Sequence, residues 1–245
     1  MFKSANKIAG MWMGISSDLK FLLEEPKRVL DPFINLRTRL ADLNTLNEVF
    51  VQQTYRWLCT DMKKDTVVVD IGGYIGETAI YFAMFDRAKK VYAYEPVYNS
   101  YKRGVANIAA SGLGGKIRFI NAAIGKADTK IFLPKNINGI TMLDAERLSD
   151  RGNSNTYTID VKTLDSVLDR IGRSKDVVIK LDSDGNEADI LRECDLGNVY
   201  RIQLEFHESY SEVISILRRK RFKTGTRNRH RGVIYKDIGD IYAWR

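Results

Sequence analysis

The sequence predicts an α/β fold in which helices cover both faces of a mostly parallel sheet, with an antiparallel C-terminal edge and an N-terminal helical extension. Three observations support this prediction. Apolar residues recur every three or four positions in residues 15–60, short apolar runs alternate with helical patterns from Thr66 onward, and residues 221–245 resemble a closing hairpin. Such alternation is typical of parallel strands joined by crossover helices.

The alternating region contains five strand candidates and five helix candidates, each identified by its apolar spacing. The strands are expected at Thr66–Asp70, Lys90–Glu95, Lys116–Asn121, Asp176–Leu181 and Tyr200–Phe206, and the helices at Glu77–Phe85, Tyr98–Ser111, Leu164–Ile171, Glu187–Glu193 and Glu212–Lys220. Residues 131–158 are poorly patterned, which favours a lid or an insertion.

Length and composition fit one globular domain with a helical extension. The chain has 245 residues, 44% of them apolar and 29% charged, and we expect the division at residues 1–60 and 61–245. No stretch reaches the roughly 18 to 20 apolar residues of a transmembrane helix. Cys59 and Cys194 are far apart and indicate neither a disulfide framework nor a zinc site. We therefore expect a cytoplasmic protein.

The first 25 residues favour an amphipathic helix packed on the domain. Lys3 and Lys7 precede a short apolar patch, as in a signal peptide, but the patch contains Gly10 and Gly14 and lacks a small-x-small cleavage site. A peripheral membrane contact is the alternative. A lid or a homodimer contact are further roles left open for the N-terminal helices.

The positive charge of the chain is local. Residues 218–231 (RRKRFKTGTRNRHR) hold eight Lys or Arg and no acid, and the remaining 31 basic residues balance the 31 acidic ones. Such a run favours an anionic partner, such as RNA or a lipid surface, or else a solvated turn.

A glycine-rich turn follows the first strand candidate (VVVDIGGYIGETAIYF, residues 67–82). Ligands of open α/β sheets bind beyond the carboxyl ends of the strands, where Gly72, Gly73 and Gly76 would let the backbone approach one closely. Asp70 favours a cationic or amine-bearing ligand over the pyrophosphate that a G-x-G-x-x-G turn binds. We therefore expect S-adenosylmethionine here, although a glycine turn without a ligand has the same pattern.

Two further strand ends complete the predicted cofactor pocket. Glu95 ends the second strand, where a carboxylate can accept hydrogen bonds from two ribose hydroxyls or cap the next helix. The third strand ends with FINAAIG, whose small residues would admit an adenine ring. The predicted cofactor-binding residues are Asp70, Gly72, Gly73, Tyr74, Gly76, Glu77, Glu95, Pro96, Asn121 and Ala122.

The fourth and fifth strands carry the predicted catalytic residues. Lys180 and Asp182 alternate with apolar residues, as do Glu205 and His207, so each pair is expected on one side of its strand. A carboxylate or a neutral histidine there can deprotonate a hydroxyl acceptor, although simple polar caps would look the same. Buried Lys180 requires a partner. No compact metal-ligand cluster is visible; an Asp182–Asp184 site for a divalent cation is the one arrangement left open.

The ordered motifs together resemble the FkbM family of S-adenosylmethionine-dependent methyltransferases over roughly residues 47–245. The resemblance rests on VVVDIGGYIGETAIYFA, VYAYEPVYNSYKRGVANIAASGL, IRFINAAIG, VKTLDSVL, VIKLDSDGNEADIL and IQLEFHE, with EVFVQQTYRWL as a lead-in helix. It implies a Rossmann-like seven-stranded methyltransferase sheet and O-methylation of a hydroxyl on a small molecule, sugar or glycolipid.

The resemblance also implies a donor half and an acceptor half of the site. The donor half comprises Asp70, Gly72 and Gly76 for methionine, Glu95 for ribose, and Asn121 and Ala122 near adenine, and the acceptor half comprises Lys180, Asp182, Glu205 and His207. The chain departs from the family pattern at Gly73-Tyr74, which bears on cofactor affinity, and at Ser183-Asp184-Gly185, which bears on acceptor chemistry.

Two other functions stay open. A tRNA or rRNA methyltransferase would place the basic residues 218–231 on phosphates and stack Phe222 and Tyr235 on bases, but the sequence lacks an Asn/Asp-Pro-Pro-aromatic segment for gripping a base amine. A non-catalytic nucleoside-binding module would need neither Asp182 nor His207. For a methyltransferase we expect direct in-line transfer, with Asp182 or His207 taking the hydroxyl proton.

Overall fold

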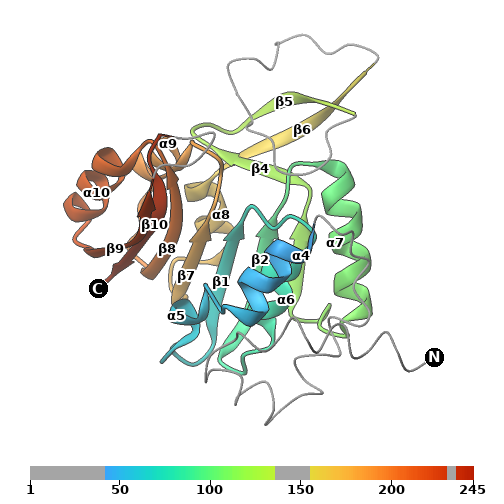
Figure 1. Cartoon of the computed structure of the whole chain (residues 1–245), viewed down its shortest axis with the longest axis horizontal. Helices are drawn as coiled ribbons and strands as arrows, with labels where there is room; N and C mark the ends of the chain where they lie inside the picture. The colour runs from blue at the N-terminus through green and yellow to red at the C-terminus, as the bar shows by residue number, and fades with distance from the viewer. Residues whose placement is uncertain (1–41, 136–154, 231–235) are drawn as a thin grey trace.

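The structure is a computed structural model that describes residues 42–135, 155–230 and 236–245. Within these ranges the chain forms two sheets, with helices packed against the larger one (Figure 1). The helices are α4 (Leu43–Leu46), the π-helix η2 (Asn47–Val51), α5 (Arg56–Cys59), α6 (Glu77–Ala83), α7 (Tyr98–Ala110), α8 (Leu164–Ile171), α9 (Glu187–Arg192) and α10 (Tyr210–Arg219). The strands are β1 (Thr66–Ile71), β2 (Ala88–Tyr94), β3 (Ile117–Ile120), β4 (Ala122–Gly125), β5 (Thr129–Pro134), β6 (Thr156–Thr163), β7 (Val177–Leu181), β8 (Val199–His207), β9 (Lys223–His230) and β10 (Ile238–Trp244).

The main sheet has seven strands in the order β3-β2-β1-β7-β8-β10-β9. The first five are parallel to their neighbours, whereas β10 runs antiparallel to both β8 and β9. The predicted α/β fold with an antiparallel C-terminal edge is therefore confirmed. From β1 the chain continues outward through β2 and β3 on one side, and from β7 it continues outward through β8 on the other. The carboxyl ends of β1 and β7 therefore border the crevice where such sheets bind ligands.

All ten predicted strands and helices of the alternating region are present, with ends within two residues of the prediction. One shift matters for the site: β8 continues to His207, one residue beyond the predicted end. The C-terminal end of a strand is hard to predict from apolar spacing alone, because polar residues at a sheet edge interrupt the pattern.

A second sheet of three strands, in the order β4-β6-β5, was not predicted. It stands at the top of Figure 1, beyond the main sheet. β5 and β6 pair antiparallel, so the described ends of residues 131–158 are strands; residues 136–154 lie outside the described ranges. Since most residues of β5 and β6 are exposed or half-buried, these strands lack the apolar run that marks a buried one.

The core lies on both faces of the main sheet. Val67 and Val69 of β1 pack on the face covered by α8, α9 and α10, whereas Val68 packs with residues of α6 on the other face. Phe50 and Leu58 join the α6 face. The described part of the N-terminal extension therefore shares the core of the sheet; the rest of it lies outside the described residues, and the division at residues 60 and 61 stays a prediction.

The C-terminal tail forms the predicted hairpin, β9 and β10, whose connecting residues 231–235 lie outside the described ranges. The basic run is not confined to the turn, because it extends from the end of α10 along β9. Phe222 is 4% exposed within the core, so the expectation that it stacks on bases is wrong; Tyr235 lies outside the described residues. Among the residues that the structure describes, no helix is long and apolar enough to cross a membrane.

Candidate functional site

The glycine turn connects β1 to α6 at the carboxyl edge of the sheet. Gly72 has φ +80°, and a Cβ at this position would lie 2.2 Å from the backbone oxygen of Asp182, which follows β7. The backbone N–H groups of Gly72 and Gly73 donate to the carbonyl of Tyr94, at 3.1 and 2.9 Å. The turn thus fills the space between the ends of three adjacent strands, and only glycine fits at residue 72.

Asp70 lies beneath this turn and is completely buried. Its Oδ2 accepts a hydrogen bond from the Thr78 hydroxyl at 2.5 Å. Its Oδ1 has no hydrogen-bond partner but lies 3.6 Å from Lys180 Nζ. Burial raises the pKa of Asp70, and Lys180 opposes this shift. The cation that faces Asp70 in this structure is therefore the side chain of Lys180.

Glu95 lies at the tip of β2 and is 6% exposed. Its two carboxylate oxygens accept hydrogen bonds from the backbone N–H groups of Tyr74, at 2.9 Å, and Val97, at 2.7 Å. Burial raises the pKa of Glu95 to about 8. Each oxygen has a second lone pair, so the carboxylate can fix the turn and still accept a ligand hydroxyl.

Tyr74 stands at the outer side of the turn with φ 41°. Its hydroxyl donates to Asp42 at 2.7 Å, and Asp42 also pairs with Arg103 of α7. Asp42, which precedes α4, is thereby connected to the glycine turn.

The remaining predicted cofactor residues hold the neighbouring strand ends together. The amide of Asn121 donates to the carbonyls of Glu95 and Pro96, at 2.8 and 3.1 Å. Ala122 is buried at the start of β4. Glu77 is also buried and accepts from the Ile75 N–H at 3.1 Å, and burial raises its pKa to about 8.

Lys180 connects the predicted donor half of the site to the predicted acceptor half. Its Nζ donates to the carbonyls of Ile71 and Gly72, at 3.1 and 2.7 Å, and lies 3.4 Å from Asp182 Oδ2. Burial alone would lower the pKa of Lys180, but Asp182 and Asp70 raise it above its ordinary value. The prediction that this buried lysine is paired is confirmed.

The acceptor half gathers at the ends of β7 and β8. Asp182, Glu205 and His207 each present one oxygen or nitrogen atom, and these atoms lie within 4.8 Å of one another. From the sequence we expected no compact metal-ligand cluster, and that expectation is wrong. Leu181 pairs with Leu204 in the parallel register, so the next residues of the two strands lie side by side, and strand adjacency of this kind cannot be seen in apolar spacing.

His207 is held by Glu187, a residue that the sequence reading treated only as a helix start. The Nδ1 atom of His207 lies 3.3 Å from Glu187 Oε1, and Glu187 is completely buried. The same Glu187 oxygen accepts from the Gly185 N–H at 2.8 Å. An acid two residues after an Asp-Gly turn is the signal by which this residue is recognisable.

Carboxylates crowd around His207 Nε2. Asp184 Oδ1 lies 3.9 Å and Glu205 Oε2 lies 4.0 Å from it. Burial raises the pKa of Glu205 to about 8 and that of Asp184 to about 6, and Asp182 contributes to both shifts. For His207, burial lowers the pKa, but the hydrogen bond with Glu187 and the charges of Glu187, Glu205 and Asp182 together outweigh it, so the net shift is upward. The acids and His207 are therefore close enough at this edge to shift one another's pKa values.

The open sheet, with its acid-glycine turn beside the β1–β7 switch and a carboxylate at the next strand tip, is the architecture of a Rossmann-like methyltransferase. A family model, the methyltransferase FkbM domain, matches residues 70–224, which is more than half of the chain, and the chain belongs to this family. It is an S-adenosylmethionine-dependent methyltransferase, as the sequence motifs predicted. A comparison with curated proteins gave no match.

Solved structures are similar at low identity. Precorrin-6y C5,15-methyltransferase from Geobacter metallireducens is 13% identical, with 76% of this chain and 84% of that chain covered and a TM-score of 0.43. Precorrin-8w decarboxylase from Methanobacterium thermoautotrophicum is 17% identical, with coverages of 78% and 90% and a TM-score of 0.45. An rRNA methylase from Streptococcus thermophilus is 12% identical, with coverages of 79% and 95% and a TM-score of 0.43. Similarities of this size do not identify an acceptor.

The residues around the turn fit S-adenosylmethionine. Gly72 keeps the turn compact, because a side chain there would meet the backbone of Asp182, and Glu95 keeps acceptor capacity for ribose hydroxyls. Asp70 and Lys180 support the turn from below, with Asp70 Oδ1 3.6 Å from Lys180 Nζ.

Proposed function

We propose that this methyltransferase O-methylates a hydroxyl group on a small molecule, a sugar or a glycolipid. The observation that supports the proposal is the arrangement of His207, whose Nδ1 is held by buried Glu187 while Nε2 faces the carboxylates of Asp184 and Glu205. A histidine oriented in this way is suited to remove or to hold a hydroxyl proton. Asp182 lies beside it and is oriented by Lys180.

The roles follow from these positions. The cofactor supplies a methyl group on a sulfonium, a reactive electrophile, so the protein has mainly to align the acceptor oxygen and exclude water. Glu95 and the glycine turn hold the donor side. On the acceptor side, either His207 or Asp182 takes the proton as the oxygen gains the methyl group. Lys180 orients Asp182 and holds the glycine turn against the end of β7.

The test is a transfer assay with methyl-labelled S-adenosylmethionine against a panel of hydroxyl-bearing sugars, glycolipids and small aglycones, with tRNA and rRNA in parallel. The proposal predicts an O-methyl ether, identified by NMR, and about a hundredfold or greater loss of kcat in His207→Gln. Ser215→Ala, on α10 away from the cluster, is the control and is expected to keep activity. Methylation of RNA alone would refute the proposal.

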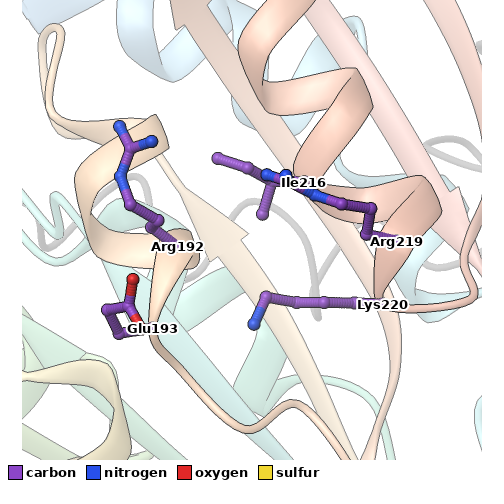
Figure 2. Close-up of a pocket in the computed structure, with 5 residues that line it drawn as sticks. All are labelled: Arg192, Glu193, Ile216, Arg219 and Lys220. Carbon is purple, nitrogen blue, oxygen red and sulfur yellow. The ribbon is translucent and has the colours of Figure 1, made fainter.

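A second proposal concerns the basic residues 218–231. We propose that they attract an anionic partner, because Arg219 and Lys220 line a pocket of about 360 Å³ between α9 and α10, beside Glu193 and Arg192 (Figure 2). Arg192 itself pairs with Glu212. Not every charge of the run is available, since Arg229 pairs with Asp237 at 2.8 Å. A homodimer and a cytoplasmic location stay predictions.

Salt dependence tests the anionic partner. Binding of labelled tRNA or of anionic lipid vesicles that falls steeply with salt, and that Arg219→Gln with Lys220→Gln reduces, would support it. Lys126→Gln with Lys130→Gln, which removes two exposed lysines at and beside β5, is the charge-matched control. Equal binding by the double variant and the control would exclude this surface.

A further inference from the structure

Three side chains at the carboxyl edge have the chemistry and the spacing of a metal site. The donor atoms of Asp182, Glu205 and His207 lie within 4.8 Å of one another. Metal–ligand bonds of about 2.0 to 2.6 Å place two ligands of the same ion about 3 to 5 Å apart. The three atoms therefore fall within the range that a single ion can span.

The way in which His207 is held is a second, independent observation. Its Nδ1 lies 3.3 Å from Glu187 Oε1, and Glu187 is itself fixed by the Gly185 N–H and the Ser209 hydroxyl. A metal-binding histidine commonly donates its other ring N–H to a carboxylate, which fixes the tautomer and the ring orientation. Glu187 is not one of the three donors, so this contact orients Nε2 from outside the cluster.

Exposure and charge also suit a cation. The side chain of His207 is 3% exposed, but those of Asp182 and Glu205 are 31% and 38% exposed. A site with one closed side and one open side leaves positions for water or for an acceptor oxygen. Asp184 adds a fourth nearby acid, whereas Lys180 is the buried cation that offsets Asp182. A divalent ion would offset the charges of the carboxylates that it binds.

We propose that Asp182, Glu205 and His207 form a binding site for a divalent cation of the Mg²⁺ or Mn²⁺ class. Two carboxylates and one imidazole are ligands that Mn²⁺ accepts, and the carboxylates also suit Mg²⁺. The role of the ion rests on the proposed function: it would hold the acceptor oxygen and lower the pKa of its hydroxyl. Both nitrogens of His207 would then be engaged, and Asp184, which lies 3.9 Å from Nε2 and is not one of the three ligands, would take the proton in place of His207 or Asp182.

Mn²⁺ binding to the full chain, freed of metals with EDTA, tests the site without cofactor or acceptor. The loss of the free Mn²⁺ signal in electron paramagnetic resonance gives the stoichiometry and the affinity. We expect one ion per chain, and an affinity about tenfold or more weaker in Glu205→Gln and in His207→Gln. Pulsed measurements on the wild type are expected to show coupling of the ion to an imidazole nitrogen, absent in His207→Gln.

Asp240→Asn is the matched control. Asp240 pairs with Glu205 in the β8–β10 register and contributes to its electrostatics, but it is not one of the three donors. Removing this charge is expected to change Mn²⁺ affinity less than about threefold. Equal weakening in Asp240→Asn and Glu205→Gln would show charge attraction without coordination and would overturn the proposal.

The failure of this inference and the failure of the proposed function are distinguishable. The absence of Mn²⁺ binding, or of nitrogen coupling, in a folded wild-type chain overturns the metal site and leaves O-methylation standing. Tight Mn²⁺ binding in a chain that methylates no hydroxyl supports the site and rejects the function.

Discussion

At the residue scale, the site depends on residues that leave almost no room for substitution. Gly72 cannot carry a side chain because the backbone of the neighbouring strand end is in contact with it. Asp70 and Lys180 are both buried and are compensated mainly by each other and by Asp182. Such positions tolerate substitution poorly, since neither the backbone nor the charges can reach water.

We predict that Gly72→Ala is far more damaging than Gly112→Ala. Both glycines have positive φ, +80° and +72°, so alanine costs each about 1 to 2 kcal/mol. Only at residue 72 does the new Cβ meet backbone, which adds about 1 to 3 kcal/mol of overpacking. Urea unfolding and S-adenosylmethionine titration of both variants measure this. Equal losses of stability would refute the close approach of β1 and β7.

Lys180→Met is expected to destabilise the fold by about 3 to 5 kcal/mol, because it leaves Asp70 as a buried charge without its cation. The double variant Lys180→Met/Asp70→Asn removes that charge and is expected to recover part of the loss. Chemical denaturation of the three proteins provides the comparison. A double variant no more stable than the single one would indicate that hydrogen bonds from Nζ, rather than the charge pair, stabilise this region.

At the element scale, the short helix α5 attaches the described N-terminal residues to the C-terminal strands. The ring of Trp57 packs edge-on against Tyr242 at 5.1 Å and Trp244 at 6.1 Å, and Arg201 lies over it at 5.3 Å. Contacts between α5 and the end of the chain connect segments far apart in the sequence, so the extension and the sheet are expected to unfold together.

Trp57→Ala is therefore expected to cost about 3 to 5 kcal/mol in a single cooperative transition. Leu43→Ala is the control, because Leu43 is 53% exposed and its truncation is expected to change stability by less than about 0.5 kcal/mol. Far-ultraviolet and tryptophan-fluorescence unfolding curves report the two variants. A Trp57→Ala curve with two transitions would mean that the N-terminal segment folds apart from the sheet.

At the scale of the whole molecule, buried acids make stability depend on pH. Burial raises the pKa of Glu77 from 4.5 to about 8, so between these values the folded chain keeps a proton that the unfolded chain releases. This bound proton adds to the free energy of unfolding at low pH, and its contribution falls as the pH rises toward 8. The slope is at most about 1.4 kcal/mol per pH unit for one group.

We expect Glu77→Gln to flatten the dependence of unfolding free energy on pH between about 5 and 8. Glu95, which has the same direction of shift, remains and leaves a residual slope. Denaturation at a series of pH values compares the variant with the wild type. Parallel curves would show that Glu77 is ionised in the folded chain.

From the amino-acid sequence alone we could predict the strands and helices of the main sheet, the glycine turn, the strand tips at Glu95 and Asp182, and the family. These features are local: apolar period, glycine content and motif spacing are all written along the chain. It also indicated that Lys180 must be paired, because an isolated charge in an apolar run is too costly.

The partners of these residues became visible only in the folded chain. The structure assigned Lys180 to Asp70 and Asp182, set Glu187 behind His207, and brought Asp182, Glu205 and His207 into one cluster. It also showed the three-stranded sheet and the burial of Phe222. The physical reason is that parallel pairing and helix packing join residues far apart in the chain, and contacts at that separation depend on register and burial rather than on any local pattern.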